Sequence, residues 1–277
     1  MASREIVMGL IGIVKEEKEI NKLYVYYFRK ETKLMWNAAM WGGISGSAVL
    51  IGALAAVFLP IKKKLIGFIM AFGTGVLIGA ATYELLEESV YSGGILSTSL
   101  GFLAGAIIFT ILDGIISKKG ANDRKRSSQS ETNNQSGIAL FIGTVMDAIP
   151  ESIMIGASLI SQSGVSVLLV IAIFISNIPE GLSSTVGLMK NNYSKKKIYL
   201  LWFAVLIISA LSSLCGYVFL DQASEEVMAA IAAFAGGGII AMVGSTMLPE
   251  AFEDGGSVTG LITALGLLTS LILNTFN

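Results

Sequence analysis

A glutamate follows a proline in the middle of two neighbouring hydrophobic segments of the chain. The first segment contains DAIPE at 147–151, and the second contains SNIPE at 176–180. A carboxylate at the centre of a bilayer costs about 2.5–3.5 kcal/mol on insertion scales, so it needs a partner or a function. Proline within a helix leaves a backbone carbonyl one turn earlier without its usual donor, which adds an oxygen beside the carboxylate. Two such motifs facing each other predict a cation site at the middle of the membrane.

The polar side chains around the two prolines are all oxygen donors. Asp147 and Glu151 lie four residues apart and therefore share one helix face. Ser176 and Glu180 repeat this spacing, and Asn177 lies three residues before Glu180. Carboxylate, amide and hydroxyl oxygens suit divalent cations. The alternative is a buried hydrogen-bonded network that only fixes helix packing, but two such motifs in consecutive segments favour metal binding.

The composition narrows the class of protein. The chain has 277 residues, of which 53% are hydrophobic and 14% charged, and its mean hydropathy is +0.73, which is typical of a polytopic helical membrane protein. It has no histidine, which excludes imidazole-dependent catalysis and imidazole metal sites, and its single cysteine excludes a thiolate cluster and an internal disulfide. No GxGD-like motif and no Walker A motif occur. We therefore expect neither an enzyme nor an ATP-driven pump, no prosthetic group and no nucleic-acid partner.

Eight hydrophobic segments are long enough to cross a bilayer as helices. They cover residues 37–59, 65–87, 95–116, 137–160, 165–189, 198–219, 227–249 and 257–275. Residues 1–36 form a charged leader whose apolar patch is too short to span, and we interpret it as an interfacial amphipathic helix. Residues 117–136 are polar and lack aromatic side chains, which predicts a flexible loop. The expected fold is an all-α membrane protein with a transport domain over 37–277.

The positive charges indicate an orientation. After Lys33, every lysine and arginine falls in the loops that follow the first, third and fifth segments. By the positive-inside rule these loops are cytoplasmic, including 117–136, and both termini lie outside. The leader carries its own basic residues, interspersed with acidic ones, and we give them less weight. We expect a multi-pass protein of the plasma (inner) membrane.

A weak internal repeat relates the second and seventh segments. Residues 71–88 align without gaps with residues 233–250, with identities that include Phe72/Phe234 and Glu88/Glu250. Because the two segments run in opposite directions in the predicted topology, this is an inverted repeat, a common scaffold for alternating access. The small residues also have a simpler explanation, since they let membrane helices pack closely, and they are compatible with a homodimer.

Acidic and other notable side chains lie near the segment ends. Glu84, with Glu87 and Glu88, ends the second segment on the outside, and we expect Glu84 to be a metal ligand at the outer opening. The methionines are expected to face lipid or the core, and Cys215 to be buried. Trp202 is expected to be an interfacial aromatic.

These motifs resemble the Zrt/Irt-like (ZIP) family of divalent-metal transporters. The resemblance covers nearly everything from residue 37 and rests on DAIPES at 147–152, SNIPEGL at 176–182 and MLPEAFEDGG at 247–256. It implies eight spans, a long variable loop after the third, and extracytoplasmic termini. It also implies that a divalent cation moves toward the cytoplasm through a site of Asp147, Glu151, Asn177 and Glu180.

Departures from the family pattern bear on selectivity. Where the family usually has histidine, this chain has Asp147, and the first position of the second motif is Ser176. The sixth segment has no acidic residue, so the resemblance supports one metal position. Oxygen ligands tilt selectivity toward Mn²⁺, Fe²⁺ or Mg²⁺, although zinc still binds well where it is available. The alternative is a non-transporting relative, a metal sensor or a structural membrane protein with a degenerate site.

Overall fold

The structure, a computed structural model, describes residues 2–116, 134–161 and 164–275. These residues form helices joined by short connections, without a β-strand among them. They divide into two compact units, Met1–Asn37 and Ala38–Asn277, and helix α1, Ala2–Phe58, contributes residues to both. The predicted flexible loop lies outside the described residues except for 134–136, which belong to the next helix.

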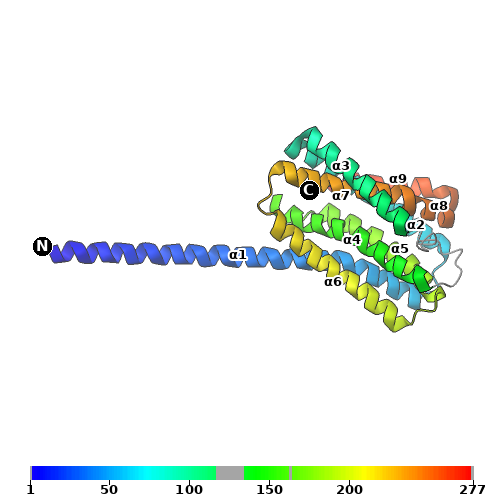
Figure 1. The fold of residues 1–277 in the computed structure, drawn as a ribbon, viewed down its shortest axis with the longest axis horizontal. Coiled ribbons are helices and arrows are strands. Elements are labelled where there is room, and N and C mark those ends of the chain that lie inside the picture. The colour runs from blue at the N-terminus through cyan, green and yellow to red at the C-terminus, as the bar shows by residue number, and fades with distance from the viewer. Residues whose placement is uncertain (1, 117–133, 162–163, 276–277) are drawn as a thin grey trace. The chain divides into compact units, whose positions relative to one another are not determined.

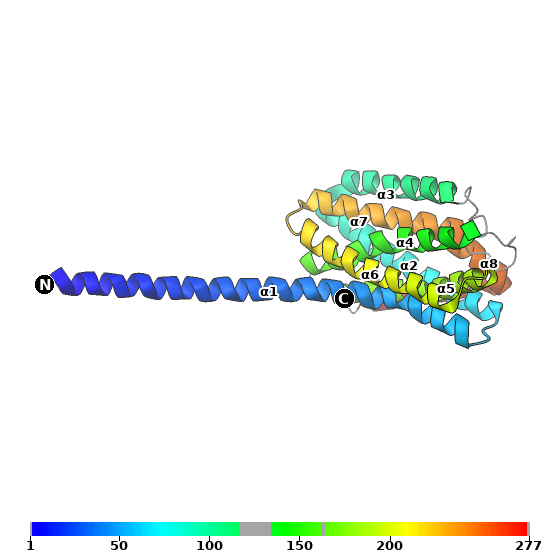
Figure 2. The ribbon, with the colours of Figure 1, turned by 60° about the horizontal axis from the view of Figure 1, so that its bottom comes forward.

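The second unit is a bundle of helices (Figures 1 and 2). After α1 the elements are α2 Lys63–Ala80, η1 Ala81–Glu87, α3 Glu88–Ile116, α4 Asn134–Ser161, α5 Val167–Lys190, α6 Lys195–Leu220, α7 Glu225–Met242, η3 Val243–Met247, α8 Leu248–Gly255, η4 Gly256–Val258 and α9 Thr259–Asn274. Within the described residues, six helical stretches are long and apolar enough to cross a membrane. The prediction of an all-helical, multi-pass integral membrane protein is therefore confirmed.

Two of the six stretches change direction at a glycine. The stretch Lys63–Ile116 contains Gly94 with φ 78°, and the stretch Glu225–Asn274 contains Gly256 with φ 75°. Each glycine follows a π-helical segment, η1 or η3, which carries wider turns than an α-helix. A positive φ is accessible to glycine without steric cost, which explains this residue type at both corners.

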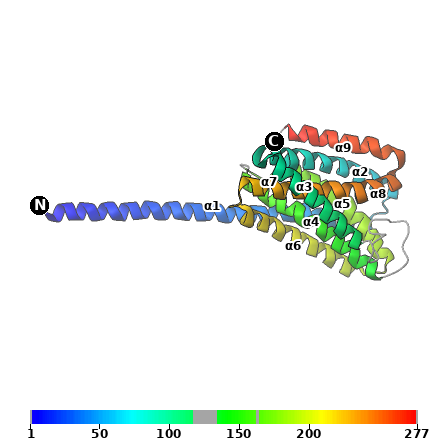
Figure 3. The same cartoon turned by 45° about the horizontal axis from the view of Figure 1, so that its top comes forward.

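Glycines also let the helices approach closely. Helix α3 packs against α7, α4 against α6, and α2 against α9 (Figure 3). In four crossings a glycine on each helix faces a backbone carbonyl of the other, so that an added Cβ would come within 2.2 Å of the oxygen. The pairs are Gly52 on Ile178 with Gly181 on Val49, Gly156 on Ser213 with Gly216 on Ile153, Gly105 on Phe234 with Gly237 on Phe102, and Gly75 on Thr263 with Gly266 on Phe72.

Two predictions about single side chains are wrong. Trp202 is fully buried, and its indole Nε1 donates a hydrogen bond to Thr185 Oγ1 at 2.8 Å, so it belongs to the packing between α5 and α6. Cys215, expected inside, is exposed on the surface of α6. Hydropathy alone does not reveal which side of a uniformly apolar helix meets other helices.

The α1–α2 and α5–α6 connections, which contain or adjoin basic residues in the sequence, lie at one end of the bundle (Figure 1). Asp254 of α8 lies within electrostatic reach of both Lys63 and Lys190. Gly67 of α2 packs against the backbone of Gly255, which brings these elements together. This end carries two of the three basic loops on which the predicted orientation depends, and the third falls among residues 117–133, outside the described part.

Candidate metal centre

Helices α4 and α5 each contain a proline that interrupts the backbone hydrogen bonds. Pro150 lies inside α4 and Pro179 lies inside α5. Because proline has no N–H, the carbonyls of Met146 and Ile175, one turn earlier, lack their usual helical donor. A polar backbone group and a glutamate side chain therefore lie close together on each helix.

The side chains around the prolines are buried in the bundle. The exposed fraction is 5% for Asp147, 2% for Glu151, 2% for Ser176, 4% for Asn177 and 3% for Glu180. Burial of a charged carboxylate is costly unless a counter-charge, a hydrogen-bond donor or a proton compensates it. Three carboxylates are thus buried on two adjacent helices, and a cation beside any of them would offset the cost of burial.

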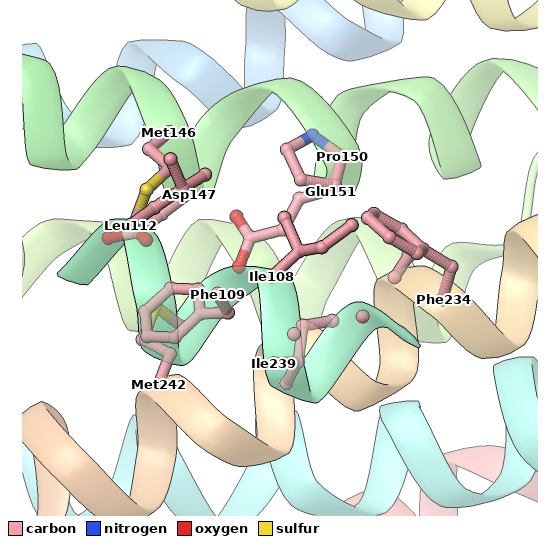
Figure 4. Close-up of a pocket in the computed structure, with 13 residues that line it drawn as sticks. Ile108, Phe109, Leu112, Met146, Asp147, Pro150, Glu151, Phe234, Ile239 and Met242 are labelled. Carbon is pink, nitrogen blue, oxygen red and sulfur yellow. The ribbon is translucent and has the colours of Figure 1, made fainter. Parts of the chain in front are cut away.

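Asp147 and Glu151 line one pocket (Figure 4). Its volume is about 100 Å³, enough for a metal ion with a few water molecules, and it lies between α3, α4 and α7. Both carboxylate side chains come from the same face of α4, as their spacing predicts. Around them the lining is apolar, so the charge of a bound cation would be balanced mainly by these two carboxylates.

Glu180 is connected to α4 through a residue that sequence reasoning missed. Thr144 Oγ1 donates a hydrogen bond to Glu180 Oε1 at 3.2 Å, and Thr144 is 3% exposed. Thr144 precedes Asp147 by three residues and Glu151 by seven, which places it on the same face of α4. That spacing is the sequence signal that could have identified it.

Comparison with known proteins identifies the family. Residues 117–274, more than half of the chain, match the profile of the family described as ZIP Zinc transporter. This chain belongs to that family. An Arabidopsis thaliana protein named "Putative zinc transporter At3g08650" is 25% identical over 216 residues, which are 75% of this chain and 33% of that protein. Protein zntB of Dictyostelium discoideum is 31% identical over 70 residues, which are 25% of this chain and 19% of that protein. The chain thus matches about a third and about a fifth of the length of these two relatives.

In this ZIP protein the two polar residues before Pro179, Ser176 and Asn177, lie outside the pocket of Asp147 and Glu151. The Ser176 hydroxyl donates to the carbonyl of Ile173 in its own helix at 3.0 Å. Asn177 is buried beside it, and neither residue lines the pocket of Asp147 and Glu151. Gly73 of α2 approaches the backbone of Ser176, so this part of α5 is held between other helices.

The structure places Glu84 in a different cavity. Glu84 Oε2 accepts a hydrogen bond of 2.7 Å from the hydroxyl of Ser166, the N-cap residue of α5. Glu84 and Glu88 line a cavity of about 320 Å³ with a largely apolar wall, which also includes the starts of α5 and α7. This cavity lies toward the end of the bundle away from the α5–α6 connection, because the starts of α5 and α7 line it.

Glu250 marks the opposite end of the ZIP bundle. It is 4% exposed, and its Oε1 accepts a hydrogen bond from the hydroxyl of Ser183 on α5. In the part of the chain that the structure describes, no three Asp, Glu or Cys side chains converge closely enough to hold a metal ion by themselves. The carboxylates thus lie at successive places along the bundle: the half-buried Glu84 and the exposed Glu88, then the buried Asp147, Glu151 and Glu180, and then the buried Glu250.

Proposed function

We propose that this protein carries a divalent metal cation of the Zn²⁺, Fe²⁺ or Mn²⁺ type across the membrane, toward the cytoplasm. The site consists of Asp147 and Glu151 on α4 and Asn177 and Glu180 on α5. The observation that carries the proposal is the burial of three carboxylates on two adjacent helices, with Glu180 linked to α4 through Thr144. Membership of the ZIP zinc transporter family supports it.

The proposed path begins at the cavity of Glu84 and Glu88. Negative side chains at an opening raise the local concentration of cations. The cation then passes to Asp147 and Glu151, where two carboxylates neutralise its charge within an apolar surrounding. Ser176 adds a hydroxyl one turn before Glu180. The metal is the cargo, and we propose no prosthetic group.

We further propose that the chain crosses the membrane eight times as an inverted repeat. The same interval of 162 residues separates Ala81 from Val243, where the π-helical segments begin, and Gly94 from Gly256, where the chain turns. The glycine crossings support the same relation. In such a repeat, spans one, two and three correspond to spans six, seven and eight (α6, α7 and α9), and span four corresponds to span five. The α1–α5 crossing then corresponds to the α6–α4 crossing, and the α3–α7 crossing corresponds to the α9–α2 crossing. Two related halves around a central site are the usual architecture for alternating access.

The membrane and the oligomeric state belong to the same proposal. The basic connections at one end of the bundle support a cytoplasmic location for that end by the positive-inside rule, and we propose the plasma (inner) membrane as the membrane. Small residues at several crossings already pack within one chain, and a homodimer would use other surfaces of the bundle.

A second candidate function follows from one observation. Among the described residues no three metal-ligating carboxylates or thiolates converge, so a ZIP relative that senses metal or has a structural role in the membrane is the competing proposal. A sensor would bind metal, a structural protein would bind it weakly or not at all, and neither would move it.

Uptake of metal into proteoliposomes distinguishes the two. We expect saturable uptake by the wild type, and loss of uptake in Glu151→Gln/Glu180→Gln, which keeps the side-chain volumes but removes two negative charges. Glu226→Gln is the matched control, because Glu226 is exposed and lines neither cavity. Folded wild-type protein that moves none of Zn²⁺, Fe²⁺ and Mn²⁺ would favour the second candidate.

A further inference from the structure

Two methionines share the pocket of Asp147 and Glu151. Met146 lies on α4 next to Asp147, and Met242 lies on the facing helix α7 (Figure 4). The sequence predicts that methionines of this chain face lipid or the core. For these two side chains the prediction is incomplete, because both line a cavity that also contains two carboxylates.

The remaining wall of the pocket offers no other side-chain donor. Apart from the two carboxylates and the two thioethers, its described lining consists of glycine, alanine, proline, isoleucine, leucine and phenylalanine. The sulfur atoms are therefore the side-chain groups that can complete a coordination shell begun by Asp147 and Glu151. Carbon cannot replace the water that a cation loses on entering a space of about 100 Å³.

Thioether sulfur and carboxylate oxygen differ in the cations that they favour. Carboxylate suits Mg²⁺ and Mn²⁺, whereas sulfur ligands favour softer ions such as zinc. Cd²⁺ is softer still and is the natural probe. Two ionised carboxylates neutralise one divalent cation, and two thioethers add ligands without adding charge, so the ligands that line this pocket are electrically neutral with the cation; Glu180 does not line it.

We propose that Met146 and Met242 are specificity-determining ligands, which with Asp147 and Glu151 form a mixed oxygen–sulfur site for soft divalent cations. The inference rests on the proposed transport function and reverses one expectation from the sequence. An oxygen-only site would tilt toward Mn²⁺, whereas the mixed site ranks Cd²⁺ and Zn²⁺ above Mn²⁺.

The position of Met146 strengthens the assignment. It precedes Asp147 directly, and it lies four residues before Pro150, so its backbone carbonyl is the one that loses its helical donor. Met242 is 3% exposed and immediately precedes the π-helical segment η3. π-Helical turns often occur at functional sites because they change the direction of the neighbouring side chains.

The test compares uptake of Cd²⁺ and Mn²⁺ by wild type and by Met146→Leu/Met242→Leu in proteoliposomes. Leucine has nearly the volume of methionine, so packing is retained while both sulfur atoms are lost. We expect the ratio of Cd²⁺ to Mn²⁺ uptake to fall about tenfold, the size of effect that supporting groups have on metal affinity. Met70→Leu is the matched control, since Met70 is buried and lines neither cavity. An unchanged ratio in the double variant would overturn the assignment.

A second measurement separates this inference from the transport proposal. X-ray absorption at the cadmium edge, recorded on purified protein with bound Cd²⁺, reports sulfur neighbours whether or not the protein transports. A sulfur contribution in the wild type that is absent from Met146→Leu/Met242→Leu supports the mixed site. A shell of oxygen alone overturns it, even if uptake is normal. Wild type that shows sulfur ligation but no uptake retains the site and contradicts the transport function.

Discussion

The crossing of α1 and α5 provides a quantitative test of how packing positions the metal centre. At Gly52 an added Cβ would lie 2.1 Å from the carbonyl oxygen of Ile178 and 2.9 Å from the amide nitrogen of Leu182. Ile178 directly precedes Pro179 and Glu180. Gly52→Ala should therefore push apart the two helices at the residues that position Glu180.

The size of the effect follows from the distances. Ordinary van der Waals contact begins at 3.4 Å, so the Cβ and the carbonyl oxygen must separate by about 1.3 Å. Overpacking of this kind typically costs about 1–3 kcal/mol. Gly43→Ala is the matched control on the same helix, because its Cβ would lie 3.6 Å from Ala210 Cβ, an ordinary contact. Both changes replace glycine by alanine in a helix and share the gain in helix propensity of about 1 kcal/mol.

Two assays measure the difference. Denaturation in mixed micelles, followed by loss of helical circular dichroism, should show Gly52→Ala less stable than Gly43→Ala by about 1–3 kcal/mol. Metal uptake should fall at least about tenfold in Gly52→Ala, because a displacement near 1 Å is enough to disturb a preorganised site. If Gly52→Ala matches Gly43→Ala in both stability and uptake, the close approach of α1 to Ile178 does not position Glu180.

Three further substitutions test single contacts. Thr144→Val removes the donor to Glu180 and should raise the KM for metal about tenfold with unchanged circular dichroism; an unchanged KM would contradict the positioning role. Ser166→Ala removes an N-cap of α5 and should cost about 1 kcal/mol in unfolding free energy. Because Ser166 also donates to Glu84, this substitution should also raise the KM for metal. Ser194→Ala, at the N-cap of α6, should affect stability alone, and equal KM values in the two variants would refute a role of Ser166 in uptake. Asp147→His should increase Zn²⁺ uptake relative to Mn²⁺, and competition assays that show no change would exclude this residue as a ligand.

Local sequence was sufficient for α5 and α6, because each is a long, mostly apolar run bounded by charge or glycine. The segment predicted at 165–189 is α5, Val167–Lys190, and the one at 198–219 is α6, Lys195–Leu220. The two carboxylates of α4 could also be placed together, since a spacing of four residues fixes one helix face.

Contacts between distant residues could not be predicted in this way. Thr144 and Glu180 lie 36 residues apart, and only the packing of α4 on α5 brings them together. Trp202 illustrates the same limit. The local sequence around a tryptophan near a helix start does not show whether its side chain lies at the membrane surface or, as here, inside the bundle with a hydrogen bond to Thr185. The sulfur atoms of the pocket were missed because methionine is common in both core and lipid-facing positions.

The two π-helical segments also affect how related chains must be compared. One extra residue would rotate the rest of a regular α-helix by about 100°, but the wider turns of η1 and η3 can absorb such a residue, so that the helix beyond keeps its faces. A relative that lacks one residue there would keep the same helix faces, with the counterpart of Glu88 or Glu250 displaced by one position in its sequence. Alignments of ZIP sequences should therefore admit single-residue gaps within residues 81–87 and 243–247. Without such gaps, the acidic residues at both ends of the path would be matched to the wrong partners.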